Sequence, residues 1–431
     1  MNEAAPLNRT QPTERSPVAG HVRWTIAALL FFATTINYLD RQVLGVLKPT
    51  LTTELHWSET DYADIVFWFQ AAYAIGLLGF GRIIDRIGTR RGYAVAIGVW
   101  SVAAILHAGV RSAVGFAVVR FTLGLGEAGN FPAGIKTIAE WFPKRERALA
   151  AGLMNAGSNV GAVITPLLVP VLVLAFGWRS AFIVTGAIGF IWLAAWLMIY
   201  RVPRAYKRLG AAELALIESD PPEPTAPVRW SALFRLRATW AFVVAKFLTD
   251  PIWYLFLFWL PDFFAKTYHL DLTTFGPPLV VIFVLADVGS IGGGWLSATL
   301  IKRGFSVNDG RKIALLVSAV LVIPVAFASG VSNLWLAVAI LGLAAAAHQG
   351  WSSNLYALVT DTVPKSAVAS VIGIGSAAGA IGGMIMAKSV GAILDSIGSY
   401  QPIFIWASSI YLVALLIVHL LLPRLRVVAP D

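Results

Sequence analysis

The stretch SAFIVTGAIGFIWLAAWLMIY, residues 180–200, decides the fold, because it carries no charged side chain over a length that can cross a bilayer. A membrane helix needs about 20 such residues to cross about 30 Å of hydrocarbon. Similar stretches recur from Trp24 to Leu422, and the whole chain is 58% hydrophobic and only 13% charged. Lipid tolerates only helices or closed barrels, and these stretches lack the alternation of barrel strands. The sequence therefore predicts an all-α integral membrane protein.

The apolar stretches predict about twelve transmembrane helices in two six-helix bundles. We expect the spans at 24–48, 61–84, 92–110, 114–140, 148–175, 180–200, 239–265, 277–301, 311–330, 333–359, 367–393 and 400–422. The domains expected are a tail at 1–23 with no signal peptide, a bundle at 24–200, a linker at 201–238, a second bundle at 239–422 and a tail at 423–431. A constant shift carries Gly152, Gly161 and Gly177 onto Gly373, Gly382 and Gly398. Such duplicated halves predict a pseudo-two-fold axis along the membrane normal, as in transporters that rock two bundles around a central site.

The basic residues predict the orientation of the helices in the membrane. One set of loops carries Arg82, Arg86, Arg90, Arg91, Lys144, Arg145, Arg147, Lys302, Arg303, Arg311 and Lys312. The opposite loops carry little beyond Lys48, Arg111, Arg179 and Lys266. By the positive-inside rule, both termini are expected in the cytoplasm. The net charge of +10 is then a topology signal with some attraction to anionic lipids, and we expect no nucleic-acid partner.

Charged side chains inside the apolar spans are the candidates for function. Each costs roughly 2.5–3.5 kcal/mol at the bilayer centre unless it has a partner or faces water. The first span holds Asp40 and Arg41, and the fourth holds Arg120 and Glu127, which share one helix face. This spacing predicts a carboxylate–arginine network between the two helices that leaves Arg41 free for a ligand. Burial favours a protonated carboxyl group and an arginine favours the ionised form, so Asp40 and Glu127 are candidate proton sites; a fixed salt bridge is the alternative.

The turn after the second expected span reads GRIIDRIGTRR, residues 81–91. It resembles the loop motif of the major facilitator superfamily, Gly-x-x-x-Asp-Arg-x-Gly-Arg-Arg, with Thr89 inserted. The resemblance implies a cytoplasmic gate, in which Gly81 permits close helix contact and Asp85 latches the gate. A basic loop that only sets topology is the alternative. The gate residues expected are Gly81, Asp85, Arg86, Gly88 and Arg90.

Further stretches carry a narrower resemblance. The runs NYLDR at 37–41, RFTLGLGEAGNFP at 120–132 and EWFP at 140–143 look like the anion:cation symporter branch of that superfamily. With KFLTDPIWY at 246–254 and WLPDFF at 259–264, the chain most resembles the bacterial hexuronate transporters. The resemblance covers nearly the whole chain. It implies a major facilitator fold in a bacterial inner membrane and proton-coupled import of a sugar-acid anion.

The resemblance also implies a role for individual residues. Asp40 and Glu127 match protonation sites, with Arg120 paired to Glu127. Arg41 matches the carboxylate ligand, with Tyr38 and Tyr73 lining the same cavity. Relatives place amides where this chain has Ser158 and Ser376, which leaves the exact sugar acid open.

The residues themselves also fit a sugar acid, which needs one cation, several neutral hydrogen-bonding groups and an aromatic face. The substrate-binding residues expected are Arg41, Tyr38, Tyr73, Asn155, Ser158, Lys246, Trp253, Ser353, Asn354 and Ser376. Helix packing is the alternative role for the Asn and Ser side chains, for Trp253 and for His348. Lys136, near the end of the fourth span, is expected to reach toward the interface.

Other functions compete with sugar-acid import. The same machinery could carry an aldonate or a small aromatic or dicarboxylic acid, and an ion channel is a further alternative. An integral membrane enzyme could use Asp250, Asp287 and His348, but the sequence has no HExxH motif, nucleophile elbow or metal-spaced cluster. We therefore expect no catalytic residue, metal or cofactor. The partners expected are the anion, protons and membrane lipids, with the protein a monomer.

Overall fold

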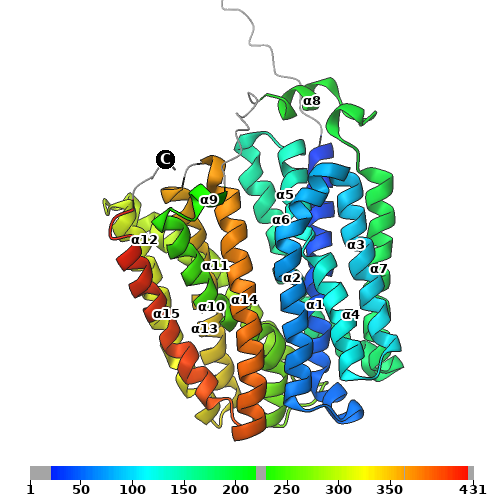
Figure 1. The fold of residues 1–431 in the computed structure, drawn as a ribbon, viewed down its shortest axis with the longest axis vertical. Helices are drawn as coiled ribbons and strands as arrows, with labels where there is room; N and C mark the ends of the chain where they lie inside the picture. The colour runs from blue at the N-terminus through cyan, green and yellow to red at the C-terminus, as the bar shows by residue number, and fades with distance from the viewer. Residues whose placement is uncertain (1–20, 220–229, 364, 426–431) are drawn as a thin grey trace, which may run out of the picture.

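The computed structural model describes residues 21–219, 230–363 and 365–425, and these residues are almost entirely helical (Figure 1). Eleven helices, counted over these residues, are long and apolar enough to cross a membrane, so the chain is a multi-pass membrane protein. Residues 1–20, 220–229 and 426–431 lie outside the described residues, and they include most of the expected tails and part of the expected linker.

The described helices form two bundles joined by the linker (Figure 1). The N-terminal half contains α1 Val22–Leu55, α2 Glu59–Ile87, α3 Thr89–Leu106, α4 Ala113–Glu127, α5 Asn130–Trp141, α6 Lys144–Phe176 and α7 Trp178–Ile199. The linker holds the short helices α8 Ala211–Ile217 and α9 Trp230–Leu233. The C-terminal half contains α10 Arg237–Tyr268, α11 Gly276–Lys302, α12 Val307–Val322, α13 Leu334–Thr362, α14 Lys365–Ile397 and α15 Gln401–Leu421. Across the two halves, α2 packs on α14, α1 on α10 and α6 on α11.

The fourth expected span, 114–140, is two helices rather than one. The 15 residues of α4 end at Glu127, and the 12 residues of α5 begin at Asn130. The break has a local cause, because Pro132 has no N–H to bond the carbonyl of Ala128 and so cannot continue the ladder. This interruption explains why eleven long spans are found where twelve are expected.

The first expected span, 24–48, is too short, because α1 continues through Pro49 to Leu55. Ser58 then begins α2 with a capping box, in which it accepts from the Asp61 N–H while the Asp61 carboxylate accepts from the Ser58 N–H. We call the end of the molecule that contains this α1–α2 turn the Lys48 end. The opposite end contains the α2–α3 turn at Gly88, and we call it the Asp85 end.

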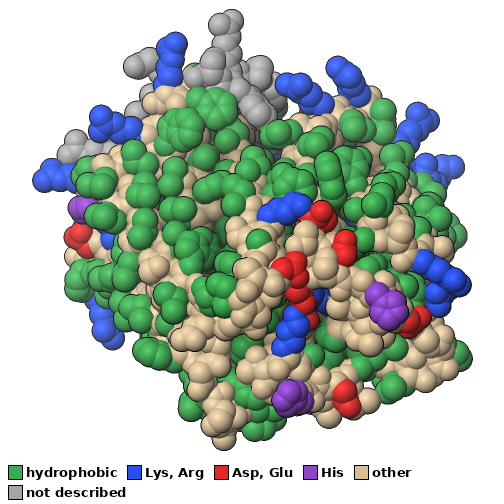
Figure 2. All heavy atoms as spheres, turned by 60° about the horizontal axis from the view of Figure 1, so that its bottom comes forward, with side chains coloured by type: hydrophobic (Ala, Val, Ile, Leu, Met, Phe, Trp, Pro, Cys, Tyr) green, Lys and Arg blue, Asp and Glu red, His purple; other side chains and the backbone are tan. Residues whose placement is uncertain are grey.

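The two halves pack closely against each other at the Lys48 end. A methyl group added at Gly45 would lie 2.8 Å from the carbonyl oxygen of Leu257 in α10. One added at Gly391 of α14 would lie 2.5 Å from Cβ of Ala63 in α2. Figure 2 views this end and shows acidic and basic side chains gathered near its middle. A side chain at either glycine would force the helices apart, so the small residues here permit the close contact between the halves.

Candidate functional site

The central feature is a buried ion pair between α1 and α4. Nε of Arg41 donates to a carboxylate oxygen of Glu127 at 2.8 Å, and the two side chains are only 2% and 0% exposed. Arg41 also donates to the Asn37 side chain at 3.4 Å. The predicted network between these helices is therefore present. The expectation that Arg41 is free for a ligand is wrong for this conformation, because Glu127 already neutralises it.

Aromatic rings surround the Arg41 guanidinium. Its Cζ lies 4.5 Å from the ring centroid of Tyr73, 4.8 Å from that of Tyr38 and 5.4 Å from that of Phe69. These rings stabilise the cation by cation–π attraction and keep bulk water away from it. Tyr38 and Tyr73 thus lie beside Arg41, as the resemblance implies.

Arg120 and Asp40 complete this cluster in a way that the sequence does not predict. The Arg120 guanidinium donates to the backbone carbonyls of Asp40 and Arg41, so it holds the α1 backbone rather than pairing with Glu127 as expected. Both carboxylate oxygens of Asp40 are buried without a hydrogen bond of ordinary length to a described residue, and Thr185 of α7 lies beside them. Asp40 therefore has no ion pair with a described basic residue, unlike Glu127.

A second buried pair lies in the C-terminal half. Lys246 contacts Asp250 at 2.7 Å, one helical turn away, and donates to the Tyr356 hydroxyl at 3.3 Å. Lys246 is therefore already neutralised within α10. A methyl group added at Gly379 of α14 would lie 2.2 Å from the Asp250 carboxylate, so this pair sits directly against α14.

Trp253 and His348 stack on each other with ring centroids 5.5 Å apart and planes within 4°. His348 Nδ1 is also 2.6 Å from the Tyr411 hydroxyl. The ring stack joins α10 to α13 and the hydrogen bond joins α13 to α15, so both contacts pack helices together. The geometry of these two residues thus matches the packing alternative that the sequence left open.

The smaller polar residues expected to bind substrate are dispersed over several helices. Ser158 donates to the carbonyl of Asn155 in its own helix at 2.6 Å, and Ser353 donates to that of Gly350 at 3.0 Å. Asn354 donates to Gly293 of α11 at 2.9 Å and so links two helices. Asn155 is exposed and Ser376 is half-buried. The bonds of Ser158 and Ser353 thus lie within their own helices, and of these three residues only Asn354 has a described bond that joins two helices.

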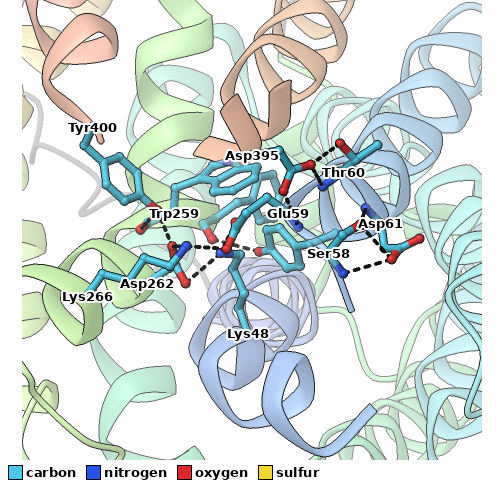
Figure 3. Close-up of polar contacts among 12 residues, drawn as sticks. Lys48, Ser58, Glu59, Thr60, Asp61, Trp259, Asp262, Lys266, Asp395 and Tyr400 are labelled. Carbon is cyan, nitrogen blue, oxygen red and sulfur yellow. Dashed lines mark hydrogen bonds and ion pairs between the residues drawn. The ribbon is translucent and has the colours of Figure 1, made fainter. Parts of the chain in front are cut away.

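Four charged residues at the Lys48 end form a network across the two halves, which we call the Lys48 cluster (Figure 3). Lys48 of α1 lies 2.6 Å from Glu59 of α2 and 2.6 Å from Asp262 of α10. Lys266 of α10 contacts the same two carboxylates, with Asp262 at 3.2 Å. The expectation that Lys48 and Lys266 lie in loops is therefore wrong: both are helical, and Lys48 is fully buried.

Neighbouring contacts strengthen this end of the molecule. Asp395 of α14 accepts from the backbone N–H groups of Glu59 at 3.2 Å and Thr60 at 2.9 Å, at the N-terminus of α2. A carboxylate is favourable there because it meets the positive end of the helix dipole. Tyr400 donates to Asp262, and Lys388 of α14 pairs with Asp64 of α2 (Figure 3 shows the Asp395 and Tyr400 contacts).

The Asp85 end differs from the Lys48 end. Asp85 pairs with Lys136 of α5 at 2.7 Å, so both partners belong to the N-terminal half. Arg311 pairs with Asp361 at 2.9 Å within the C-terminal half. A methyl group at Gly81 would meet nothing within 4 Å, which is contrary to the close contact expected there. The ion pairs that the structure describes at this end therefore leave the two halves unlinked.

Sequence reasoning missed two buried amides. Gln70 of α2 and Gln42 of α1 are each buried, and no described residue bonds either end of their amide groups. A signal was present, because each is an uncharged polar residue inside an apolar span. That signal is weaker than that of a charged residue, because burying a charge is more costly than burying an amide.

Comparison with known proteins identifies the family. The family model described as Major Facilitator Superfamily matches residues 30–385. The hexuronate transporter of Escherichia coli strain K12 is 34% identical over 89% of this chain and 90% of its own length. The galacturonate transporter of Dickeya chrysanthemi is 33% identical over 70% of this chain and 89% of its own.

A solved structure supports the same fold. A bacterial homologue of the human lysosomal transporter Spinster, in an inward-facing and unoccupied conformation, superposes with a TM-score of 0.69 at 18% identity. It covers 93% of this chain and 95% of its own. With two helical bundles, eleven long apolar helices and a matching family model, this chain belongs to the major facilitator superfamily and is a membrane transporter rather than an enzyme.

Proposed function

We propose that this transporter imports a sugar-acid anion together with protons, by alternating access. The observation that carries the proposal is the buried Arg41–Glu127 pair inside its ring of aromatic side chains. An arginine matches a carboxylate with two parallel hydrogen bonds, and aromatic rings match the apolar face of a sugar. The similarity to hexuronate and galacturonate transporters supports a hexuronate such as glucuronate or galacturonate as the substrate.

The pairing suggests how protons are coupled to the anion. A buried arginine is neutralised by one anion, and here that anion is the Glu127 carboxylate, 2.8 Å from Nε of Arg41. When Glu127 takes a proton, Arg41 becomes available for the carboxylate of the substrate. When the proton leaves, Glu127 competes for Arg41 and favours release. Asp40 supplies a second proton site, and two protons per monoanion would move one positive charge inward.

The contrast between the two ends suggests how the site opens. We take the Asp85 end as cytoplasmic, because its loops carry most of the basic residues. The Lys48 cluster then closes the opposite side, and this conformation faces the cytoplasm of a bacterial cell.

The test is a counterflow assay with purified protein in liposomes. Labelled glucuronate and galacturonate should exchange, whereas glucose and galactose, which lack the carboxylate, should not compete. Galactonate and benzoate separate the alternatives of an aldonate or an aromatic acid. Exchange of neither hexuronate, with strong competition by one of these two acids, would overturn the assignment of substrate.

A further inference from the structure

Gln70 of α2 is a buried amide to which none of the roles above applies. Its side chain is fully buried, and neither Oε1 nor Nε2 has a hydrogen-bond partner among the residues that the structure describes. An amide carries two donors and an acceptor, and burying them unpaired is unfavourable. Such a group is stabilised by a ligand that offers both a donor and an acceptor.

The position of Gln70 connects it to the Arg41 site. Tyr73, three residues later and on the same face of α2, lies 4.5 Å from the Arg41 guanidinium. Gly383 of α14 lies opposite: a methyl group added there would be 3.1 Å from Nε2 of Gln70 and 2.6 Å from Cδ2 of Tyr254. The amide therefore points across the contact between the two halves, where Gly383 has no side chain to cover it.

Gln42 is likewise a buried amide without a hydrogen-bond partner among the described residues. Of the two, only Gln70 is described in contact with Gly383 of α14. We propose that Gln70 is a specificity-determining residue that binds hydroxyl groups of the substrate, an inference that rests on the proposed function. Nε2 would donate to one hydroxyl oxygen while Oε1 accepts from its neighbour. The preferred substrate class is then a carboxylate with adjacent hydroxyls, rather than any organic anion of similar size.

The experiment compares Gln70→Met with the parent protein, because methionine keeps the length of the side chain and removes its polar atoms. Binding of galacturonate, glucuronate and a set of monodeoxy galacturonates is measured by calorimetry, and the melting temperature is measured without ligand. We expect Gln70→Met to weaken galacturonate binding at least tenfold. At least one monodeoxy galacturonate should bind the variant and the parent equally, because the lost hydroxyl and the lost amide are partners. The ligand-free melting temperature should be unchanged or higher.

Asn130 provides the matched control, since it is a buried amide with both partners present. It donates to Thr34 at 3.3 Å and accepts from Tyr93. Asn130→Leu should lower the melting temperature and leave the order of preference among these ligands unchanged. Unaltered galacturonate binding in Gln70→Met, equal loss for every ligand, or a lowered ligand-free melting temperature would each overturn the role of Gln70. If the parent protein itself binds no hexuronate, both the role of Gln70 and the proposed function are refuted.

Discussion

Two clusters of buried charge differ in the helices that they join. Arg41, Glu127, Arg120 and Asp40 all belong to the N-terminal half, so their partners can change while the halves stay in place. The Lys48 cluster includes residues of both halves and cannot be divided unless the halves separate. On the proposed mechanism the two clusters have separate tasks: the first binds and releases an ion, and the second holds one end closed.

The Lys48 cluster can also divide without leaving a charge alone. Lys48 and Glu59, 2.6 Å apart, would stay together in the N-terminal half. Lys266 and Asp262, 3.2 Å apart, would stay together in the C-terminal half. Because each half keeps one positive and one negative charge, opening breaks two contacts but creates no isolated buried ion, which would be far more costly. This arrangement suits a contact that opens in each cycle of the proposed alternating access.

The largest expected effect is that of Glu127→Gln on accumulation. Glutamine imitates the protonated carboxyl group permanently, so Arg41 stays available while the proton can no longer be carried. Counterflow exchange of galacturonate should continue, and uphill accumulation driven by an imposed pH gradient should be lost. Accumulation by the variant at the parent level would remove Glu127 from the coupling mechanism.

Arg41→Lys should weaken substrate binding next most strongly. Lysine keeps the charge but lacks the planar fork that matches a carboxylate, so we expect a loss of about ten- to a hundredfold in affinity, or ~1.4–2.8 kcal/mol. Calorimetry with galacturonate measures the change, and Lys246→Gln serves as the comparison in the other half. Normal affinity in Arg41→Lys together with lost binding in Lys246→Gln would move the carboxylate site to α10.

Asp262→Asn should open the Lys48 end without abolishing binding. The substitution leaves Lys48 and Lys266 to share Glu59. Losing a hydrogen bond to a charged group destabilises the closed state by about 1.5–3 kcal/mol, which shifts the conformational equilibrium about tenfold or more. The chain contains no cysteine, so spin labels at Thr53→Cys in α1 and Gln401→Cys in α15 report the opening directly. A distance distribution identical to that of the labelled parent would show that the cluster does not hold this end closed.

The smallest effect belongs to the outer pair at the same end. Lys388 and Asp64 are 46% and 41% exposed, and exposed pairs contribute only about 0.2–1 kcal/mol. Lys388→Gln should therefore shift the same spin-label distances much less than Asp262→Asn. An equal or larger shift would assign the closing role to the contact between α2 and α14 instead.

The sequence predicts most of the spans and the identity of the central charges, because apolar runs of bilayer length, and the charged residues inside them, can be recognised without a structure. It does not predict the break in the span 114–140 or the extension of the first helix to Leu55. It does not predict which arginine pairs with Glu127, since that depends on the depth and rotation of α1 against α4. Lys48 is the last residue of the first expected span, 24–48, and the sequence groups it with the basic residues of the loops. Its partner Asp262 is more than two hundred residues away in the chain, so only the packed structure shows why the lysine is buried.

The most direct test of the division of tasks records proton entry and labelled galacturonate entry together in the same liposomes. We expect the parent protein to carry protons inward in a fixed ratio to galacturonate. Asp262→Asn should keep that ratio while its rate changes, and Glu127→Gln should exchange galacturonate with no associated proton movement. Galacturonate entry without protons in the parent, or a changed ratio in Asp262→Asn, would contradict the separation of coupling from closure.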